Sequence, residues 1–218
     1  MGEGALITLP SLKTLQFRGI GAYLESLVAQ IRVPLLEKLH IGLFHQFTFV
    51  LPHFFNLINN RKVFKLSSAK VYFDCNQVSV STVHDYGLGR SAFTFYVMCK
   101  PLDRQIDCAA RICHALIPTL FDVKELWLDL SYKERNDAID SATWHDLLRT
   151  FIGVKRLDIN NALSEKLSRA LQVDELGSDP SFLPNPQSIY ARHNLYTSFI
   201  DTRQVMGPSV QFQVAQWL

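Results

Sequence analysis

The chain has 218 residues, of which 48% are hydrophobic and 19% charged, so we expect one domain with a sizeable core or one elongated stack of repeats. Its 22 basic and 20 acidic residues nearly cancel to a formal charge of +2, and this balance argues against nucleic acid or an acidic lipid surface as partner. The most apolar window, residues 39–58, contains three histidines and a proline. A packed core is expected there rather than a membrane span.

From residue 12 onward, a short pattern of alternating apolar residues recurs along the chain. Such alternation predicts short strands with one inward face. The units are Leu12, Leu15 and Phe17; Leu36, Leu39 and Ile41; a weaker one at Val63 and Leu66; Val123, Leu126 and Leu128; Val154, Leu157 and Ile159; and a degraded copy at Ile189 and Ala191. The first units start 24 and 27 residues apart, an interval of 60 follows, and the last full interval is 31. Leucine-rich repeats have periods of about 20 to 29 residues, so the long interval predicts an insertion.

Helical spacing of apolar residues occurs between these strands. It predicts helices over 22–31, 51–60, 107–121, 141–152 and 163–172. The insertion, about 69–100, is rich in strand formers and is expected to add antiparallel strands, either within the repeat sheet or at its edge. Residues 177–187 contain three prolines and are expected to be a connection, and about 193–218 is expected to close the stack. Together these features predict one α/β domain over 1–218: a leucine-rich-repeat-like solenoid of strand–helix units with a parallel sheet and an inserted antiparallel β segment.

In such a stack, the strand residues between the apolar positions share one surface. We therefore predict a protein-binding face, because extended curved sheets of this kind commonly hold protein partners. Trp127 is either an exposed anchor for the partner or a core residue, and the sequence leaves both alternatives open. The candidate partner-binding residues are Gln16, Arg18, Lys38, His40, Glu125, Trp127, Asp129, Arg156, Asp158, Asn160, Tyr190 and Arg192.

The stretch from Leu9 to Ile58 resembles the leucine-rich part of fungal F-box-like proteins. The likeness lies in Tyr23-Leu24-Glu25, in "PLLEKLHI" at 34–41 and in 44–52, and it continues in "WHDLLRTFIGVKRLDINNALSEKLSRALQ" and "FIDTRQVMGPSVQFQVAQWL". In that family an N-terminal F-box binds the Skp1-type adaptor of a cullin ubiquitin ligase, and the repeats are taken to select substrates. The resemblance therefore implies a substrate-recognition region. No F-box precedes residue 9, so the adaptor is an expected partner only if an F-box lies upstream.

Signatures of an enzyme are not found in the sequence. There is no G-x-S-x-G, H-E-x-x-H or P-loop motif, and the G-x-G of "RGIGAYLE" lacks the third glycine of a dinucleotide loop. The four cysteines have no zinc-ligand spacing, and no secretory signal opens the chain, so reduced thiols are expected in a cytoplasmic or nuclear protein. We predict a non-enzymatic protein-interaction domain without cofactor, metal, nucleic acid or membrane. The alternative is a scaffolding repeat protein with no ubiquitin-ligase link.

Overall fold

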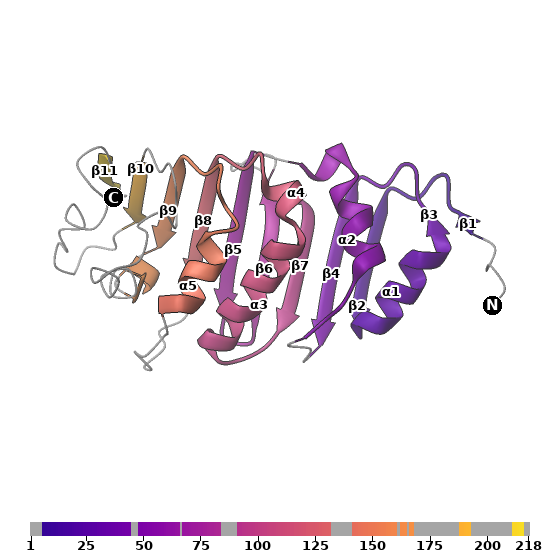
Figure 1. Cartoon of the computed structure of the whole chain (residues 1–218), viewed down its shortest axis with the longest axis horizontal. Helices are drawn as coiled ribbons and strands as arrows, with labels where there is room; N and C mark the ends of the chain where they lie inside the picture. The colour runs from indigo at the N-terminus through magenta and orange to yellow at the C-terminus, as the bar shows by residue number, and fades with distance from the viewer. Residues whose placement is uncertain are drawn as a thin grey trace.

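The computed structural model describes residues 6–44, 48–65, 67–83, 91–131, 141–160, 162–164, 166–167, 188–192 and 211–215. In these ranges the chain forms one large sheet and a layer of helices (Figure 1). In chain order the elements are β1 (Ile7–Thr8), β2 (Thr14–Gly19), α1 (Gly21–Gln30), β3 (Ile31–Arg32), β4 (Lys38–Phe44), α2 (Pro52–Asn59), the 3-10 helix η1 (Lys62–Phe64), β5 (Ser68–Asp74), β6 (Gln77–Val83), β7 (Ser91–Met98), α3 (Leu102–Ala115), α4 (Ile117–Leu120), β8 (Glu125–Leu130), α5 (Ser141–Leu148), β9 (Arg156–Asn160), β10 (Ser188–Arg192) and β11 (Gln211–Ala215).

The large sheet has nine strands in the order β11-β10-β9-β8-β5-β6-β7-β4-β2. Every neighbouring pair is parallel except the two pairs made by β6, which runs antiparallel to both β5 and β7. The short strands β1 and β3 form a separate parallel pair at the N-terminal end. The sheet is therefore mixed, with its one reversed strand in the interior.

This topology contradicts the predicted solenoid with a parallel sheet. In a solenoid each unit lies beside the preceding one, but after β4 the chain skips two strand positions to form β5 and then returns through β6 and β7. The physical cause is that β6 and β7 carry apolar alternation of their own, with Val78, Val80, Phe93 and Phe95 fully buried. A fully buried inward face is typical of a strand in the interior of a sheet, and β6 and β7 lie there, so they separate the leucine units of β4 and β8.

The strands predicted from the leucine units around Leu15, Leu39, Leu126 and Leu157 are confirmed as β2, β4, β8 and β9. The weak unit at Val63 is wrong, because residues 62–64 form η1, and Leu66 lies outside the described residues. The predicted helices of the first half are confirmed as α1 and α2, whereas 107–121 is divided between α3 and α4. Most of 163–172 and of 193–218 lies outside the described residues.

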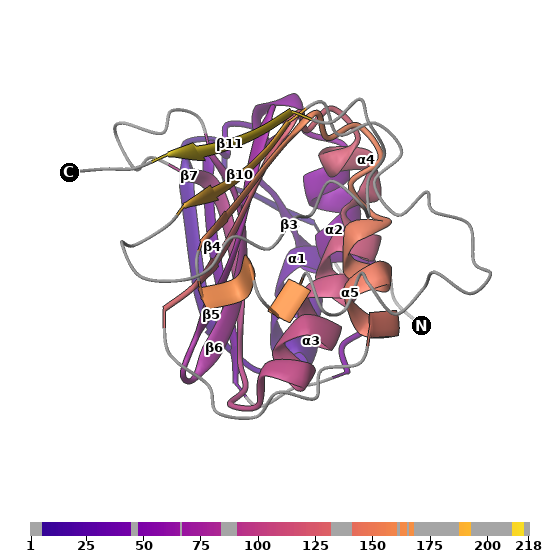
Figure 2. The same ribbon diagram turned by 90° about the vertical axis from the view of Figure 1, so that its left-hand side faces the viewer.

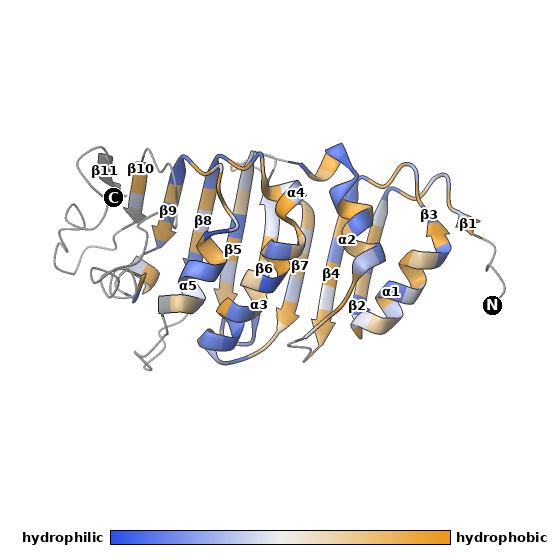
Figure 3. Cartoon of the chain, viewed as in Figure 1, coloured by the Kyte–Doolittle hydropathy of each residue, from blue (hydrophilic) through white to orange (hydrophobic). Residues whose placement is uncertain are grey.

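Helices α1 to α5 lie on the same side of the sheet (Figure 2). Polar and apolar residues alternate along the strands (Figure 3), and the apolar set faces the helices in one continuous core. The central residue of its aromatic part is Phe95, whose ring centroid lies 5.5 Å from that of Phe54 and 6.0 Å from that of Phe55. The opposite face carries the intervening polar side chains, and no described helix covers it.

Glu25 connects the first two helices. Its carboxylate, projecting from α1, accepts backbone hydrogen bonds from the amides of His53 (2.6 Å) and Phe54 (3.1 Å), and it also contacts the His53 ring at 2.7 Å. Both amides lie in the first turn of α2, where backbone N–H groups lack partners within the helix and a negative charge is favourable. Glu25 therefore caps α2 from a neighbouring element and fixes the spacing of the two helices.

Candidate protein-binding face

The predicted partner-binding residues belong to the set of strand residues that point away from the helices. We call the surface that this set forms the open face. Neighbouring strands lie about 4.8 Å apart, so β4 and β8, with three strands between them, are separated by about 19 Å. The predicted residues therefore form two groups rather than one: Gln16, Arg18, Lys38 and His40 on β2 and β4, and the other eight on β8, β9 and β10. The side chain of Arg192 lies outside the described part.

The second group is largely neutralised by its own contacts. Lys70 on β5 pairs with Asp129 at 2.5 Å, and Arg156 lies 3.8 Å from both Glu125 and Asp158. The Arg156 guanidinium also stacks 4.5 Å from the ring centroid of Tyr190, as expected for a cation over an aromatic face. We call this part of the open face the paired half. Its charges bind one another, which leaves little net attraction for a charged partner.

Trp127 lies within the paired half and is only 4% exposed. In the sheet register it stands between Lys70 of β5 and Asp158 of β9, on the face opposite the helix-side core. It is therefore a buried side chain of the open face and not an exposed anchor. Asn160, at the end of β9, donates a hydrogen bond from Nδ2 to the Leu130 carbonyl oxygen at 2.7 Å and so joins the ends of β8 and β9.

The first group differs in charge. Gln16 and Arg18 on β2 and Lys38 on β4 are exposed, and His40 is half-buried. β2, β4 and β7 contain no aspartate or glutamate, and among the described residues no carboxylate forms an ion pair with Arg18 or Lys38. We call this part the cationic half. Its two permanent charges are held on rigid sheet positions and are available to a partner.

A glycine shapes the cationic half. Arg18, Gly42 and Tyr96 are consecutive neighbours across β2, β4 and β7. The ring of Tyr96 lies over Gly42 so closely that a Cβ atom added there would be 2.2 Å from the Tyr96 Cζ atom. The missing side chain lets the ring reach across β4, where its centroid lies 6.0 Å from the Arg18 guanidinium carbon. Only glycine at position 42 permits this arrangement.

No motif or repeat in the sequence singled out Tyr96, Lys70 or Gly42 as a binding residue. Tyr96 and Lys70 lie in the predicted insertion, which falls outside the leucine units. A signal was nevertheless present, because alternation within "AKVYFD" and "AFTFYVM" already assigns Lys70 and Tyr96 to the polar side of their strands. What could not be read was which strands become their neighbours.

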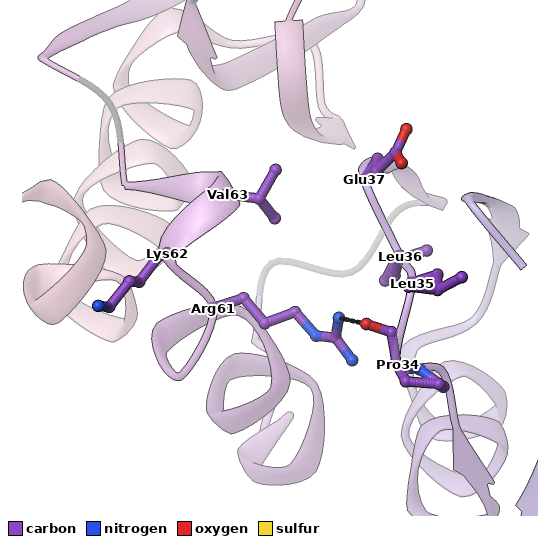
Figure 4. A pocket seen from close by; sticks show the side chains of 7 residues that line it. All are labelled: Pro34, Leu35, Leu36, Glu37, Arg61, Lys62 and Val63. Carbon is purple, nitrogen blue, oxygen red and sulfur yellow. Dashed lines mark hydrogen bonds between the residues drawn. The ribbon is translucent and has the colours of Figure 1, made fainter. Parts of the chain in front are cut away.

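A shallow hollow of about 300 Å³ lies between the segment leading into β4 and η1 (Figure 4). It is lined by Pro34, Leu35, Leu36, Glu37, Arg61, Lys62 and Val63. The Arg61 guanidinium donates hydrogen bonds to the carbonyl oxygens of Val33 and Pro34, and burial lowers the pKa of this group. Arg61 thus holds the segment before β4 in place, which is a structural role.

Cys75 is exposed in the turn after β5, while Cys99, Cys108 and Cys113 are buried. Its neighbour Asp74 accepts hydrogen bonds from the Cys75 amide at 2.7 Å and from Ser131 Oγ at 3.0 Å, and these bonds lower the pKa of the carboxyl. A hydrogen bond to Asp74 in turn raises the pKa of the Cys75 thiol. This environment opposes thiolate formation, which is the opposite of what a cysteine nucleophile requires.

We expect iodoacetamide to modify Cys75 alone in the native protein, and more slowly at pH 7.5 than it modifies a free cysteine. The thiolate is the reactive form, and a raised pKa reduces its fraction at every pH below that pKa. Replacing Asp74 with asparagine removes the carboxylate, lowers the thiol pKa and should increase the rate. Mass spectrometry over a pH series measures this, and Cys75→Ser should show no labelling. Labelling of Cys75 as fast as that of a free cysteine, or an unchanged rate in Asp74→Asn, would contradict the conclusion that Asp74 raises the pKa of the Cys75 thiol.

Among the described residues, no three His, Cys, Asp or Glu side chains converge as a metal site requires. Within the same part of the chain, no helix has the length and apolar character needed to cross a membrane. The chain matches no protein family, no characterised protein and no solved structure.

Proposed function

We propose that the chain is a non-enzymatic protein-interaction domain and that the cationic half of its open face contacts an acidic surface of a protein partner. The observation that carries this proposal is the contrast between the two halves. Lys70 and Arg156 are paired with carboxylates, whereas Arg18 and Lys38 have no carboxylate neighbour on their strands. A cation without an ion pair on a rigid surface gives an acidic partner both attraction and orientation.

The surroundings of Arg18 support a protein partner rather than a small ion. Tyr96 presents a half-buried ring beside it, and Phe44, at the end of β4, is 41% exposed. Aromatic side chains together with arginine are typical of the residues that contribute most to protein–protein binding. The chain as a whole has a charge of only +2, so this local arrangement, rather than net charge, would give the binding its selectivity.

A role as the substrate-recognition part of a ubiquitin ligase is a narrower proposal, supported by the sequence resemblance to F-box-like proteins. It requires an F-box in the full gene product and co-purification of that product with a Skp1-type adaptor. The absence of the adaptor, together with retained binding at the cationic half, would favour the scaffolding alternative.

Charge reversal on the open face tests the broader proposal. In affinity capture with quantitative mass spectrometry, Arg18→Glu/Lys38→Glu should lose partners that the wild-type chain retains, by about tenfold or more. The matched control is Arg104→Glu/Arg149→Glu, which makes the same change in charge at two exposed positions on the helix side. Recovery of the same proteins with all three baits, in the same amounts, would show that the proposal is wrong.

A further inference from the structure

β2 is the edge strand of the nine-stranded sheet, and its outer edge is paired with no described strand. The Lys13 carbonyl oxygen accepts a hydrogen bond from the Lys38 amide at 2.9 Å, so it points toward β4. Peptide groups of an extended strand alternate in direction, which turns the backbone groups of Leu15 and Phe17 toward β4 as well. The N–H and C=O groups of Thr14, Gln16 and Arg18 therefore point to the unpaired edge. A further strand can hydrogen-bond to these three residues.

The helix side of this edge is also incomplete. Leu15 and Phe17 are only half-buried, whereas their register partners Leu39 and Ile41 on β4 are fully buried. Large exposed apolar side chains are concentrated in the flanking segments: Leu6, Ile7, Leu9, Ile20, Tyr23 and Leu27 all lie within residues 6–27. An added strand with apolar side chains on this side would cover Leu15 and Phe17 in the way that β4 covers them on the other side.

The charges favour a partner protein over a second copy of this chain. On the open face, side chains of an added strand would lie about 5 Å from those of Thr14, Gln16 and Arg18. An antiparallel pair of two β2 strands would bring two cationic halves together and supply no carboxylate to either Arg18. An acidic side chain from a different protein would instead neutralise Arg18.

We propose that β2 accepts an extended segment of a partner protein as an additional strand, and that this segment alternates acidic residues on the open face with apolar residues on the helix side. The inference rests on the proposed function, since it specifies how the acidic partner is held. The main-chain hydrogen bonds supply affinity, and the alternation supplies selectivity, as in other cases where a peptide joins a sheet edge.

The test uses the complete chain and a display library of random peptides of about eight residues, which is within the usual range of strand lengths. Selection on the wild-type chain should enrich peptides that alternate apolar with acidic residues. Gln16→Pro should weaken their binding about tenfold or more, because proline removes the outward N–H and blocks the edge. Gln16→Ala, which keeps that N–H, should bind within about twofold of the wild type.

Gln16→Pro removes no hydrogen bond to β4, so the variant should fold, and far-UV circular dichroism checks this. If Gln16→Pro does not fold, Thr14→Pro is used in its place. Unchanged binding in the proline variant, or enriched peptides without alternation, overturns the inference. A dimer of the wild-type chain that Gln16→Pro dissociates assigns the edge to a second copy and also overturns it. If Arg18→Glu/Lys38→Glu abolishes binding and the proline variants do not, only the edge mechanism fails. If neither has an effect, the proposed function fails as well.

Discussion

Replacing Trp144 with alanine is expected to lower the free energy of unfolding by about 3–5 kcal/mol, because it removes a large, completely buried side chain. Trp144 lies in α5 and meets Phe73 of β5 in an edge-to-face contact, with ring centroids 5.9 Å apart. The contact joins the helix layer to the sheet where β5 adjoins β8. Urea denaturation followed by circular dichroism measures the loss.

Trp144→Phe provides the matched control. The Trp144 indole N–H is buried and donates to no described residue, and a buried donor without a partner costs about 1–3 kcal/mol. Phenylalanine removes this cost and keeps an aromatic ring near Phe73, although it leaves a small cavity. We therefore expect Trp144→Phe to lie within about 1.5 kcal/mol of the wild type. A loss as large as that of Trp144→Ala would show that the N–H makes an essential bond.

The sequence was informative about individual strands because burial of one face imposes a period of two residues. The alternation that identified these strands reflects burial of one face, and the inward-facing residues are indeed fully buried, as in Leu39, Ile41, Leu126 and Leu128. The same period says nothing about which strand lies beside which. Val78 and Val80 on β6 look like any other inward-facing pair, yet β6 runs antiparallel in the interior of the sheet. The predicted solenoid was wrong because, although most individual strands were predicted correctly, their order in the sheet was not.

For the candidate site too, the sequence predicted the face on which a residue lies but not its neighbours. Alternation correctly assigned Arg18, Lys38 and Arg156 to positions between the inward-facing residues. Whether such a charge is free or neutralised depends on neighbours from distant parts of the chain, such as Lys70 for Asp129. The burial of Trp127 also depends on those neighbours, and for this reason the sequence left its two alternatives open.

The division of the open face follows from where the reversed strand lies. β6 contributes Gln77, Ser79 and Ser81 to the open face, none of them charged, between Lys70 on β5 and the strands of the cationic half. Uncharged side chains at the centre keep the carboxylates of β8 and β9 away from Arg18 and Lys38. The departure from a regular repeat therefore helps to leave those two cations free.

Replacing Gln105 with methionine is expected to lower the free energy of unfolding by about 2–4 kcal/mol, because it leaves several backbone carbonyl groups without a donor. The buried Gln105 amide of α3 donates to the carbonyl oxygens of Asp74 at 2.6 Å, Cys99 at 2.8 Å and Lys100 at 3.2 Å. One side chain thus joins the end of β5 to the segment that follows β7. Methionine has a similar volume, so a cavity contributes little, and the lost hydrogen bonds account for the effect.

Gln77→Met makes the same chemical change on β6, where the side chain is half-buried on the open face. A substitution at such a position should change stability by less than about 0.5 kcal/mol. Urea denaturation of the two variants, measured side by side, separates the loss of the Gln105 hydrogen bonds from any general effect of methionine. Equal stability of the two variants would mean that solvent replaces the Gln105 amide at these carbonyl groups, and that α3 is held on the sheet by its apolar contacts alone.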